Sequence, residues 1–150
     1  TGGITEFIPL PYVSMESPMY KRGNSRPGPT FNEVLLMHAV SRIALNPHIK
    51  NIQASWVKLG KEGALSCLNA GVNDMGGTLM NESISRAAGS IHGQEFEANR
   101  MEEFIRNSER RPQLRNTIYE PIQSGVNSEI SYDLSMTYMQ TFLDSAHPVV

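Results

Sequence analysis

Three segments of this sequence combine polar or aromatic side chains that could bind a small molecule, and each follows a short apolar run. They are residues 9–12, 53–58 and 73–82. Gln53 and Ser55 are two positions apart, so on an extended strand their side chains point to the same face. On that face they could hydrogen-bond a polar ligand, or they could equally satisfy one another and water.

The segment 73–78 (NDMGGT) is the most suggestive of the three. Its two glycines allow a ligand to approach the backbone closely. A helix predicted to begin near Asn81 would offer free backbone N–H groups. Asn73, Asp74 and Glu82 could add hydrogen bonds to a phosphate or a polyol, with Thr78 beside them. Glycines before a helix are often only part of a turn, so this motif is weak by itself.

Two further residues have a functional and a structural interpretation. Trp56 could stack on a heteroaromatic ring or could simply fill the core. Lys58 could bind an anion, although a solvated side chain is the more ordinary interpretation for a lone lysine.

Metal binding and nucleophilic catalysis find little support. The only cysteine is Cys67, in a helical stretch at 62–70 where a buried core position is favoured over a nucleophile. One cysteine cannot form an intrachain disulfide or hold zinc or an iron–sulfur cluster alone. The histidines lack a metal-ligand spacing; they are His38, His48, His92 and His147.

The elements that would position these residues alternate between strand and helix. Strands are predicted at 6–10, 51–56 and 72–76, and helices at 30–45, 61–69, 81–88 and 97–107. Thr30 followed by Glu33 is typical of a capping box. Repeated strand–helix units indicate an α/β fold with parallel strands, here about three units of a larger (β/α) barrel. A small doubly wound sheet is the alternative, although no G-x-G-x-x-G motif supports a dinucleotide site.

The last 29 residues differ from this pattern. We predict a helix at about 132–143, either docked or in a loosely ordered extension. The sequence therefore divides into a barrel region at 1–121 and an extension at 122–150.

Composition sets the remaining limits. The 150 residues are 39% hydrophobic and 19% charged, as in a soluble globular domain, and the net charge of −2 does not favour nucleic-acid or membrane partners. No apolar run approaches the roughly 18 residues of a membrane span, and no signal-peptide pattern is present. With a single cysteine, a reducing, cytoplasmic compartment is expected. The chain opens with Thr rather than Met, and we expect it to be a piece of a longer protein.

Long motifs in this sequence resemble one enzyme family. Residues 3–12 (GITEFIPLPY), 51–60 (NIQASWVKLG) and 70–89 (AGVNDMGGTLMNESISRAAG) are similar, in order, to the hydroxybenzyl-transferring subunit of FO synthase. That family belongs to the radical S-adenosylmethionine (SAM) superfamily. The resemblance covers about four-fifths of the chain and stops near Pro121.

The resemblance implies a reaction and its cofactors. In the family, SAM is cleaved at a [4Fe-4S] cluster, and the 4-hydroxybenzyl group of L-tyrosine is joined to 5-amino-6-(D-ribitylamino)uracil. A partner subunit or fused half then closes the deazaflavin ring of FO, the coenzyme F-420 precursor. The three-cysteine cluster motif of the superfamily is absent from this chain, so we expect the fragment alone to bind no cluster and to be inactive.

The resemblance also implies which residues line the site, without separating contacts to tyrosine from contacts to the uracil. Ile8, Pro9 and Leu10 match a segment near the SAM adenosine. The expected substrate-side residues are Gln53, Ser55, Trp56, Asn73, Asp74, Thr78 and Glu82.

Two alternatives remain. A radical SAM enzyme of the futalosine route to menaquinone shares the block around Asn73 and Asp74, although residues 7–11, 53–58 and 81–86 favour the deazaflavin enzyme. A non-catalytic binding module built from half a barrel would explain the missing cluster motif, but it would not need the polar residues retained at the strand ends.

Overall fold

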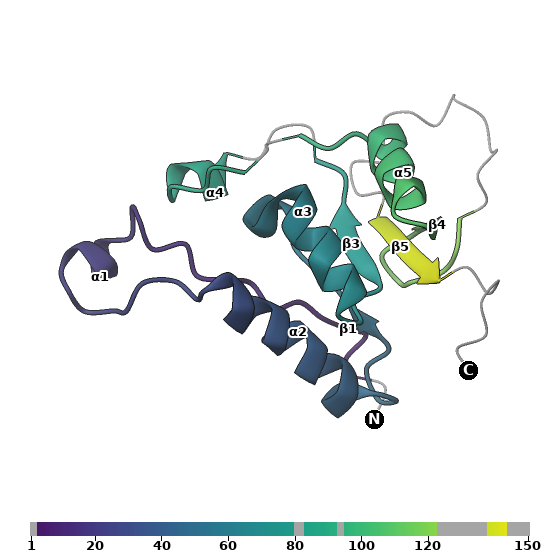
Figure 1. Cartoon of the computed structure of the whole chain (residues 1–150), viewed down its shortest axis with the longest axis horizontal. Coiled ribbons are helices and arrows are strands. Elements are labelled where there is room, and N and C mark those ends of the chain that lie inside the picture. Colours follow the sequence, from purple (N-terminus) through teal and green to yellow (C-terminus); the bar gives the residue numbers. More distant parts are fainter. Residues whose placement is uncertain (1–2, 80–82, 93–94, 123–137, 144–150) are drawn as a thin grey trace.

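Three short parallel strands form the centre of the molecule (Figure 1). The computed structural model describes residues 3–79, 83–92 and 95–122, together with the backbone of 138–143. Strand β1 (Glu6–Phe7) pairs in parallel with β2 (Asn51–Ile52). Just beyond β2, Gln53 forms a parallel bridge to Asp74, the first residue of β3 (Asp74–Gly77). The spatial order of these strands therefore follows their order in the sequence.

Helices follow the first two strands, which confirms the predicted α/β pattern. Helix α2 (Phe31–Leu45) begins with the predicted capping box, in which the Thr30 hydroxyl accepts from the Glu33 N–H and the Glu33 carboxylate accepts from the Thr30 N–H. Helix α3 (Trp56–Asn69) packs beside α2 (Figure 1). It is kinked at Gly60, whose φ of 70° lies in the left-handed region.

The predicted strand at 51–56 is too long. Pairing ends at Gln53, Ser55 is the N-cap of α3, and Trp56 is already helical. The helix thus starts five residues before the predicted position of 61, because the kink at Gly60 joins an extra turn to it. Ser55 is consequently not a paired strand residue, although its backbone is extended, and a site face shared with Gln53 remains a prediction.

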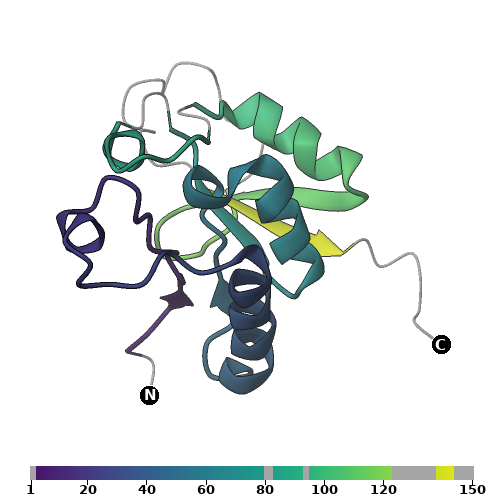
Figure 2. The ribbon, with the colours of Figure 1, turned by 60° about the vertical axis from the view of Figure 1, so that its left-hand side comes forward.

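The remaining helices are short. They are α1 (Pro18–Lys21), α4 (Ile84–Ala87) and α5 (Ala98–Asn107). Helix α5 agrees with the predicted helix at 97–107, whereas α4 covers only part of the predicted 81–88, of which residues 81 and 82 lie outside the described residues. Helices α1 and α4 lie at the same side of the molecule, remote from α5 (Figure 2).

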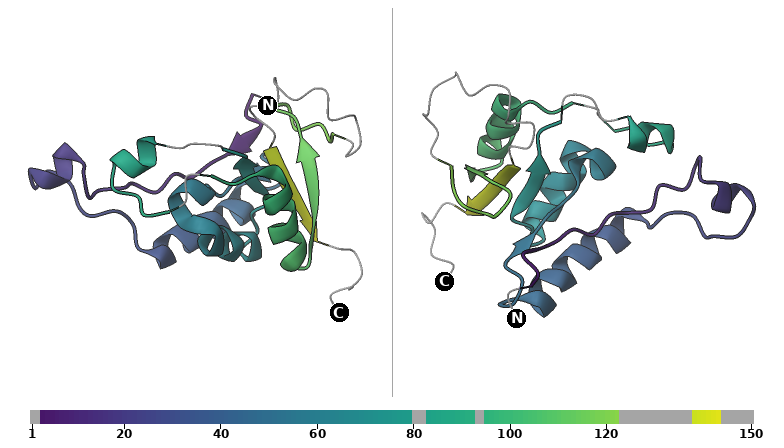
Figure 3. Two further views of the ribbon diagram at one scale, coloured as in Figure 1. Left: turned by 90° about the horizontal axis from the view of Figure 1, so that it is seen from above. Right: turned by 180° about the vertical axis from the view of Figure 1, so that it is seen from behind.

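Two antiparallel strands extend the sheet. Strand β5 (Tyr138–Leu143) lies between β3 and β4 (Arg110–Arg115) and runs antiparallel to both (Figure 3). The helix predicted at 132–143 is therefore wrong over 138–143, where the backbone is extended and paired. The run YMQTFL, with its aromatic residues and threonine, suits a strand as well as a helix, and pairing with two neighbours decides between them.

The hydrophobic core lies between the strands and helices α2, α3 and α5. Its aromatic part is a chain of edge-to-face contacts from Trp56 to Phe96 and from Phe96 to Phe104, with ring centroids 5.4 and 5.9 Å apart. Met101 and Ile105 bury the inward face of α5. Among the described residues, no helix has the length and apolar character needed to cross a membrane.

Candidate functional site

The strands have one face packed on the helices and one face turned away from them. Ile52 and Ala54 belong to the core, so Gln53 between them points to the opposite side. By the same alternation Asp74 faces opposite to Met75. We call the side that carries Glu6, Gln53, Asp74 and Gly76 the inner face.

Gln53 lies directly against the backbone of β3. Gly76 has a φ of 78°, and a Cβ on it would be only 2.6 Å from the Gln53 side-chain nitrogen. A glycine is therefore required at residue 76, both for the backbone conformation and for the space that the amide of Gln53 occupies.

A buried ion pair joins Asp74 to Arg115 at the end of β4. The Arg115 Nε donates to Asp74 Oδ2 over 2.5 Å, and the Gly76 N–H donates to Asp74 Oδ1 over 2.6 Å. Both side chains are almost completely buried. Burial raises the pKa of Asp74, while the Arg115 charge and these hydrogen bonds act in the opposite direction. Both carboxylate oxygens are thus engaged within the protein.

Tyr119 extends this cluster to β1. Its ring stacks on the Arg115 guanidinium, with Cζ 3.6 Å from the ring centroid, and its hydroxyl donates to Glu6 Oε2. Burial raises the pKa of Tyr119, and the nearby Asp74 carboxylate raises it further. We name Glu6, Asp74, Arg115 and Tyr119 the inner-face cluster; it ties β1, β3 and β4 together.

Asn73 does not join the inner face. Its Oδ1 accepts from Arg42 Nη2 of α2 over 2.7 Å and from the Ile52 N–H over 2.9 Å. Arg42 also donates to the Gly71 carbonyl. Asn73 therefore connects α2 to the strands on the helix side, opposite to its sequence neighbour Asp74.

The other predicted site residues occupy several environments. Trp56 is 2% exposed, donates to the Gly77 carbonyl over 3.0 Å and packs on Phe96 in the core. Ser55 and Thr78 are half-buried at the ends of β2 and β3. Glu82 lies outside the described residues. Of the substrate-side set, the structure brings Gln53 and Asp74 together and separates Asn73 and Trp56 from them.

The residues predicted to lie near SAM are apolar and follow β1. Ile8 and Pro9 are half-buried, whereas Leu10 is 63% exposed. Pro9 and Leu10 line a groove of about 590 Å³ beside α2.

The segment after β1 and the start of α3 line a depression of about 380 Å³ that includes Tyr12, Lys58 and His92. The described residues of the 73–82 segment are not among its lining, so a single mouth shared by all three segments remains a prediction. Lys58 Nζ donates to the Ser85 hydroxyl over 2.6 Å, which joins the first turn of α3 to α4. The His92 ring lies where a Cβ on Gly60 would be, so the kink in α3 leaves room for this loop.

Metal ligands are lacking in the part of the chain that the structure describes, where no three His, Cys, Asp or Glu side chains form a group that could hold an ion. Cys67 is fully buried, and burial raises the pKa of its thiol to about 11. An iron–sulfur cluster is held by several cysteine thiolates, so a single buried cysteine does not fit such a centre.

Sequence reasoning missed Glu6, Arg115 and Tyr119. The segment 110–115 (RRPQLR) has no apolar alternation that could have indicated the strand. The pairing of Arg115 with a carboxylate 41 residues away depends on the tertiary fold and not on any local pattern.

Comparison with known proteins places this geometry in context. The profile of the family described as "CofH/MqnC C-terminal region" matches residues 1–128. The 5-amino-6-(D-ribitylamino)uracil--L-tyrosine 4-hydroxyphenyl transferase of Methanopyrus kandleri is 50% identical over 123 residues, which are 82% of this chain and 33% of that protein. The transferase 1 of that name from Methanosarcina mazei is 50% identical over 124 residues, 79% of this chain and 32% of that protein.

The FO synthase of Streptomyces coelicolor is 46% identical over 122 residues, 81% of this chain and 14% of that protein. The chain thus spans about a third or less of the length of these relatives. No solved structure matches it.

Proposed function

Because the chain belongs to the CofH/MqnC C-terminal region family, we propose that it is the C-terminal part of a transferase that joins the 4-hydroxybenzyl group of L-tyrosine to 5-amino-6-(D-ribitylamino)uracil. The observation that carries the proposal is the 50% identity over 123 residues with a protein named for that reaction. The product would be a precursor of FO. A partner subunit or a fused half would then close the deazaflavin ring of FO.

The strand arrangement supports a place in a (β/α) barrel. Consecutive strands of such a barrel are parallel neighbours in chain order, each followed by a helix. Strands β1 and β2 with helices α2 and α3, followed by β3, have this order. We propose that residues 1–121 complete a larger barrel whose interior is bordered by the inner face, and that 122–150 form an extension.

The cofactors would be held mainly by the upstream part of the full-length protein. Membership of the radical SAM family implies SAM and an iron–sulfur cluster, which supply the radical chemistry. Since this chain has a single cysteine, the ligands of the cluster would come from the rest of the full-length protein. Ile8, Pro9 and Leu10 are retained as proposed neighbours of SAM because they follow β1 at the carboxyl end of the strands, where barrel active sites lie.

The role proposed for this chain is to hold the acceptor and exclude water. The Gln53 amide can both donate and accept, as the ring carbonyl and N–H groups of an aminouracil require. The remaining residues proposed to contact the acceptor, or to hold the residues that do, are Ser55, Trp56, Asn73, Asp74, Thr78 and Glu82. Asp74 would act by fixing the strand beside Gln53, because both its oxygens are already engaged. Holding the acceptor against the reacting carbon replaces a bimolecular encounter by a positioned one.

One alternative is supported by a specific observation. The matching family description also includes MqnC, so the family match does not separate the transferase from the menaquinone-route enzymes. The relatives that match at 44–56% identity carry the transferase or FO synthase names, which favours the first proposal.

The test is a graft. Residues 1–128 of this chain would replace the matching third of the Methanopyrus kandleri transferase, and the reconstituted protein would be assayed with tyrosine, SAM and 5-amino-6-(D-ribitylamino)uracil. We expect the coupled product, and a strong loss in a Gln53→Ala graft but not in an Arg106→Ala graft, whose change is at an exposed ion pair with Glu102 on α5.

Absence of product from a graft that is folded and retains its cluster absorbance would contradict the proposal. Turnover of a futalosine-type substrate in place of the aminouracil would assign the chain to the alternative enzyme.

A further inference from the structure

Two side chains of the inner face have hydrogen-bonding atoms without a partner in the part of the chain that the structure describes. The Gln53 carboxamide lies against Gly76, is half-buried and makes no hydrogen bond to a described residue. Glu6 uses only its Oε2, which accepts from the Tyr119 hydroxyl and lies 3.9 Å from Arg115 Nη2. Its Oε1 has no partner among the described residues, and its side chain is 35% exposed.

The other members of the inner-face cluster hold Glu6 in place. Asp74 uses both of its oxygens, one for the Gly76 N–H and one for Arg115 Nε. Tyr119 has a φ of 65°, which a residue with a side chain rarely adopts, and this backbone presents its hydroxyl to Glu6 and its ring to Arg115. Glu6 Oε2 is therefore fixed from within the protein, and Oε1 is left as a positioned acceptor.

The negative charge of Glu6 is only partly balanced. Two carboxylates face one guanidinium, whose Nε lies 2.5 Å from Asp74 Oδ2 and whose Nη2 lies 3.9 Å from Glu6 Oε2. Tyr119 adds no charge, because burial raises the pKa of its hydroxyl. Inside the proposed barrel water would be excluded, and a carboxylate oxygen without a donor is costly there. A ligand with a hydrogen-bond donor for Oε1 would remove this cost.

Glu6 and Gln53 together define the chemistry of that ligand. They lie on neighbouring parallel strands, since Glu6 is opposite Asn51 in the pairing of β1 with β2. A carboxylate only accepts, whereas a carboxamide both donates and accepts. An aminouracil has ring and amino N–H groups that alternate with its carbonyls, so it offers both kinds of group on one planar edge. Tyrosine offers its ammonium as a donor but has no planar edge that pairs with a carboxamide.

We propose that Glu6 determines specificity for the acceptor, with Oε1 accepting a hydrogen bond from an N–H group of 5-amino-6-(D-ribitylamino)uracil beside Gln53. The proposal rests on the proposed function, because it takes the acceptor from that reaction and adds the residue that recognises its donors. Tyr119 is a positioning residue, because its hydroxyl holds Oε2 and thereby directs Oε1 toward the ligand.

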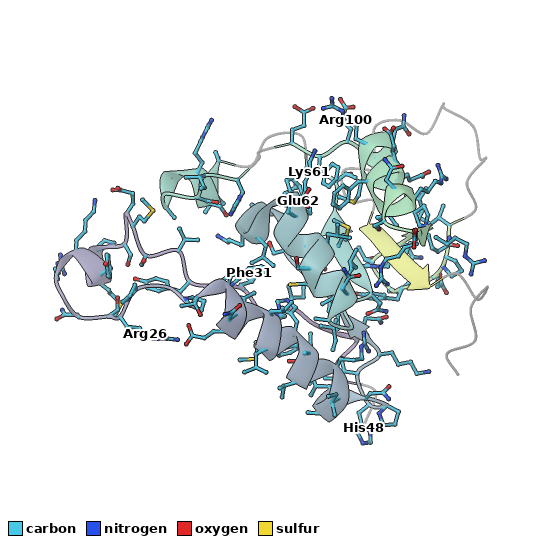
Figure 4. All side chains as sticks on the ribbon, viewed as in Figure 1. Arg26, Phe31, His48, Lys61, Glu62 and Arg100 are labelled. Carbon is cyan, nitrogen blue, oxygen red and sulfur yellow. The ribbon has the colours of Figure 1, made fainter. Side chains whose placement is uncertain are left out.

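Glu6→Gln tests the contact in the full-length protein or in the graft described above. The substitution keeps the shape of the side chain and an oxygen that can accept from Tyr119, but it removes the charge. Glu62→Gln is the matched control, because Glu62 is exposed on α3, on the helix side of the strands (Figure 4). Binding of the aminouracil and of tyrosine is measured separately by anaerobic titration calorimetry, and urea unfolding gives the stability of each variant.

We expect the affinity for the aminouracil to fall about tenfold or more in Glu6→Gln, since a hydrogen bond to a charged group is lost. The affinity for tyrosine should stay at the parental value. Tyr119→Phe should weaken binding of the aminouracil by a smaller factor, because Glu6 keeps its charge but Oε2 is no longer held. Glu62→Gln should bind both ligands as the parent does.

Parental affinity for the aminouracil in folded Glu6→Gln would overturn the proposal. A loss confined to tyrosine would overturn it as well, by assigning Glu6 to the tyrosine ammonium. Equal losses for both ligands that match a loss of folded protein would assign Glu6 a structural role and refute the contact.

The proposed function and this contact can fail separately. Coupled product from an enzyme whose Glu6→Gln variant binds the aminouracil normally would retain the function and refute the contact. Binding of the aminouracil that depends on Glu6, without any coupled product, would support the contact and count against the function. A folded parent that binds no aminouracil at all would refute both.

Discussion

Arg115 and Asp74 are the residues on which the inner face depends most. A buried charge that loses its partner is costly because it has left water without compensation. Here the Arg115 guanidinium also stacks on the Tyr119 ring, and its Nη2 lies 3.9 Å from Glu6 Oε2. Loss of Arg115 would therefore remove several contacts between β1, β3 and the end of β4, and not a single hydrogen bond.

Arg115→Met should lower the free energy of unfolding by about 3–5 kcal/mol, since it leaves the buried Asp74 without its ion pair. The measurement is urea unfolding of the graft. Arg26→Met, at an exposed ion pair with Glu33, is the control and should have little effect. The double variant Arg115→Met with Asp74→Asn should recover part of the loss, and a single variant as stable as the parent would show that the pair contributes nothing.

Residue-level chemistry was only partly predictable. Gln53 and Asp74 were identified from their types and lie together on the inner face. Asn73 was identified from the same motif but faces α2, because alternation along β3 sends neighbours to opposite sides. Trp56 was predicted at a strand end but is the first residue of α3, where its ring packs on Phe96 in the core. Arg115 and Tyr119 could not be found because their partners are distant in the sequence.

At the scale of elements, α2 is the best-determined part of the fold. Its first turn is fixed by the Thr30–Glu33 capping box, and its buried residues follow the helical period. Local signals therefore suffice to predict where it begins. Helix α3 shows the opposite case, since its extra first turn is joined through a glycine that local rules take as an end.

Thr30→Ala should destabilise the protein by about 1 kcal/mol, because the N-cap hydroxyl that accepts from the Glu33 N–H is lost. Thermal unfolding of the graft measures the change. Thr30→Ser keeps the hydroxyl and should behave like the parent. If alanine and serine have the same melting temperature, the cap does not contribute to the stability of α2.

For the molecule as a whole, the alternation of strands and helices indicated the α/β class correctly. The barrel remains a proposal, supported by the order of three parallel strands. The extension was assigned the wrong secondary structure over 138–143, because a run of six residues is too short to show a decisive period and its pairing with β3 and β4 is set by the rest of the fold.

The contribution of the extension can be measured by comparing grafts that end at residue 128 and at residue 150. Residues 110–115 pair with β5 in the structure, so their amides should exchange more slowly with solvent in the longer graft. Hydrogen exchange followed by mass spectrometry gives this comparison, and residues 98–107 of α5 are the internal reference. Identical exchange of 110–115 in the two grafts would exclude β5 from the sheet.

The kink at Gly60 leaves this position little evolutionary freedom. Any other side chain there would meet two penalties at once, a strained backbone at φ 70° and a collision with the His92 ring. Gly3, by contrast, has open space around it. Substitutions should therefore be rare at residue 60 and common at residue 3 among related sequences. The absence of a Cβ at Gly60 leaves the space that the His92 ring occupies at the edge of the depression lined by Tyr12, Lys58 and His92.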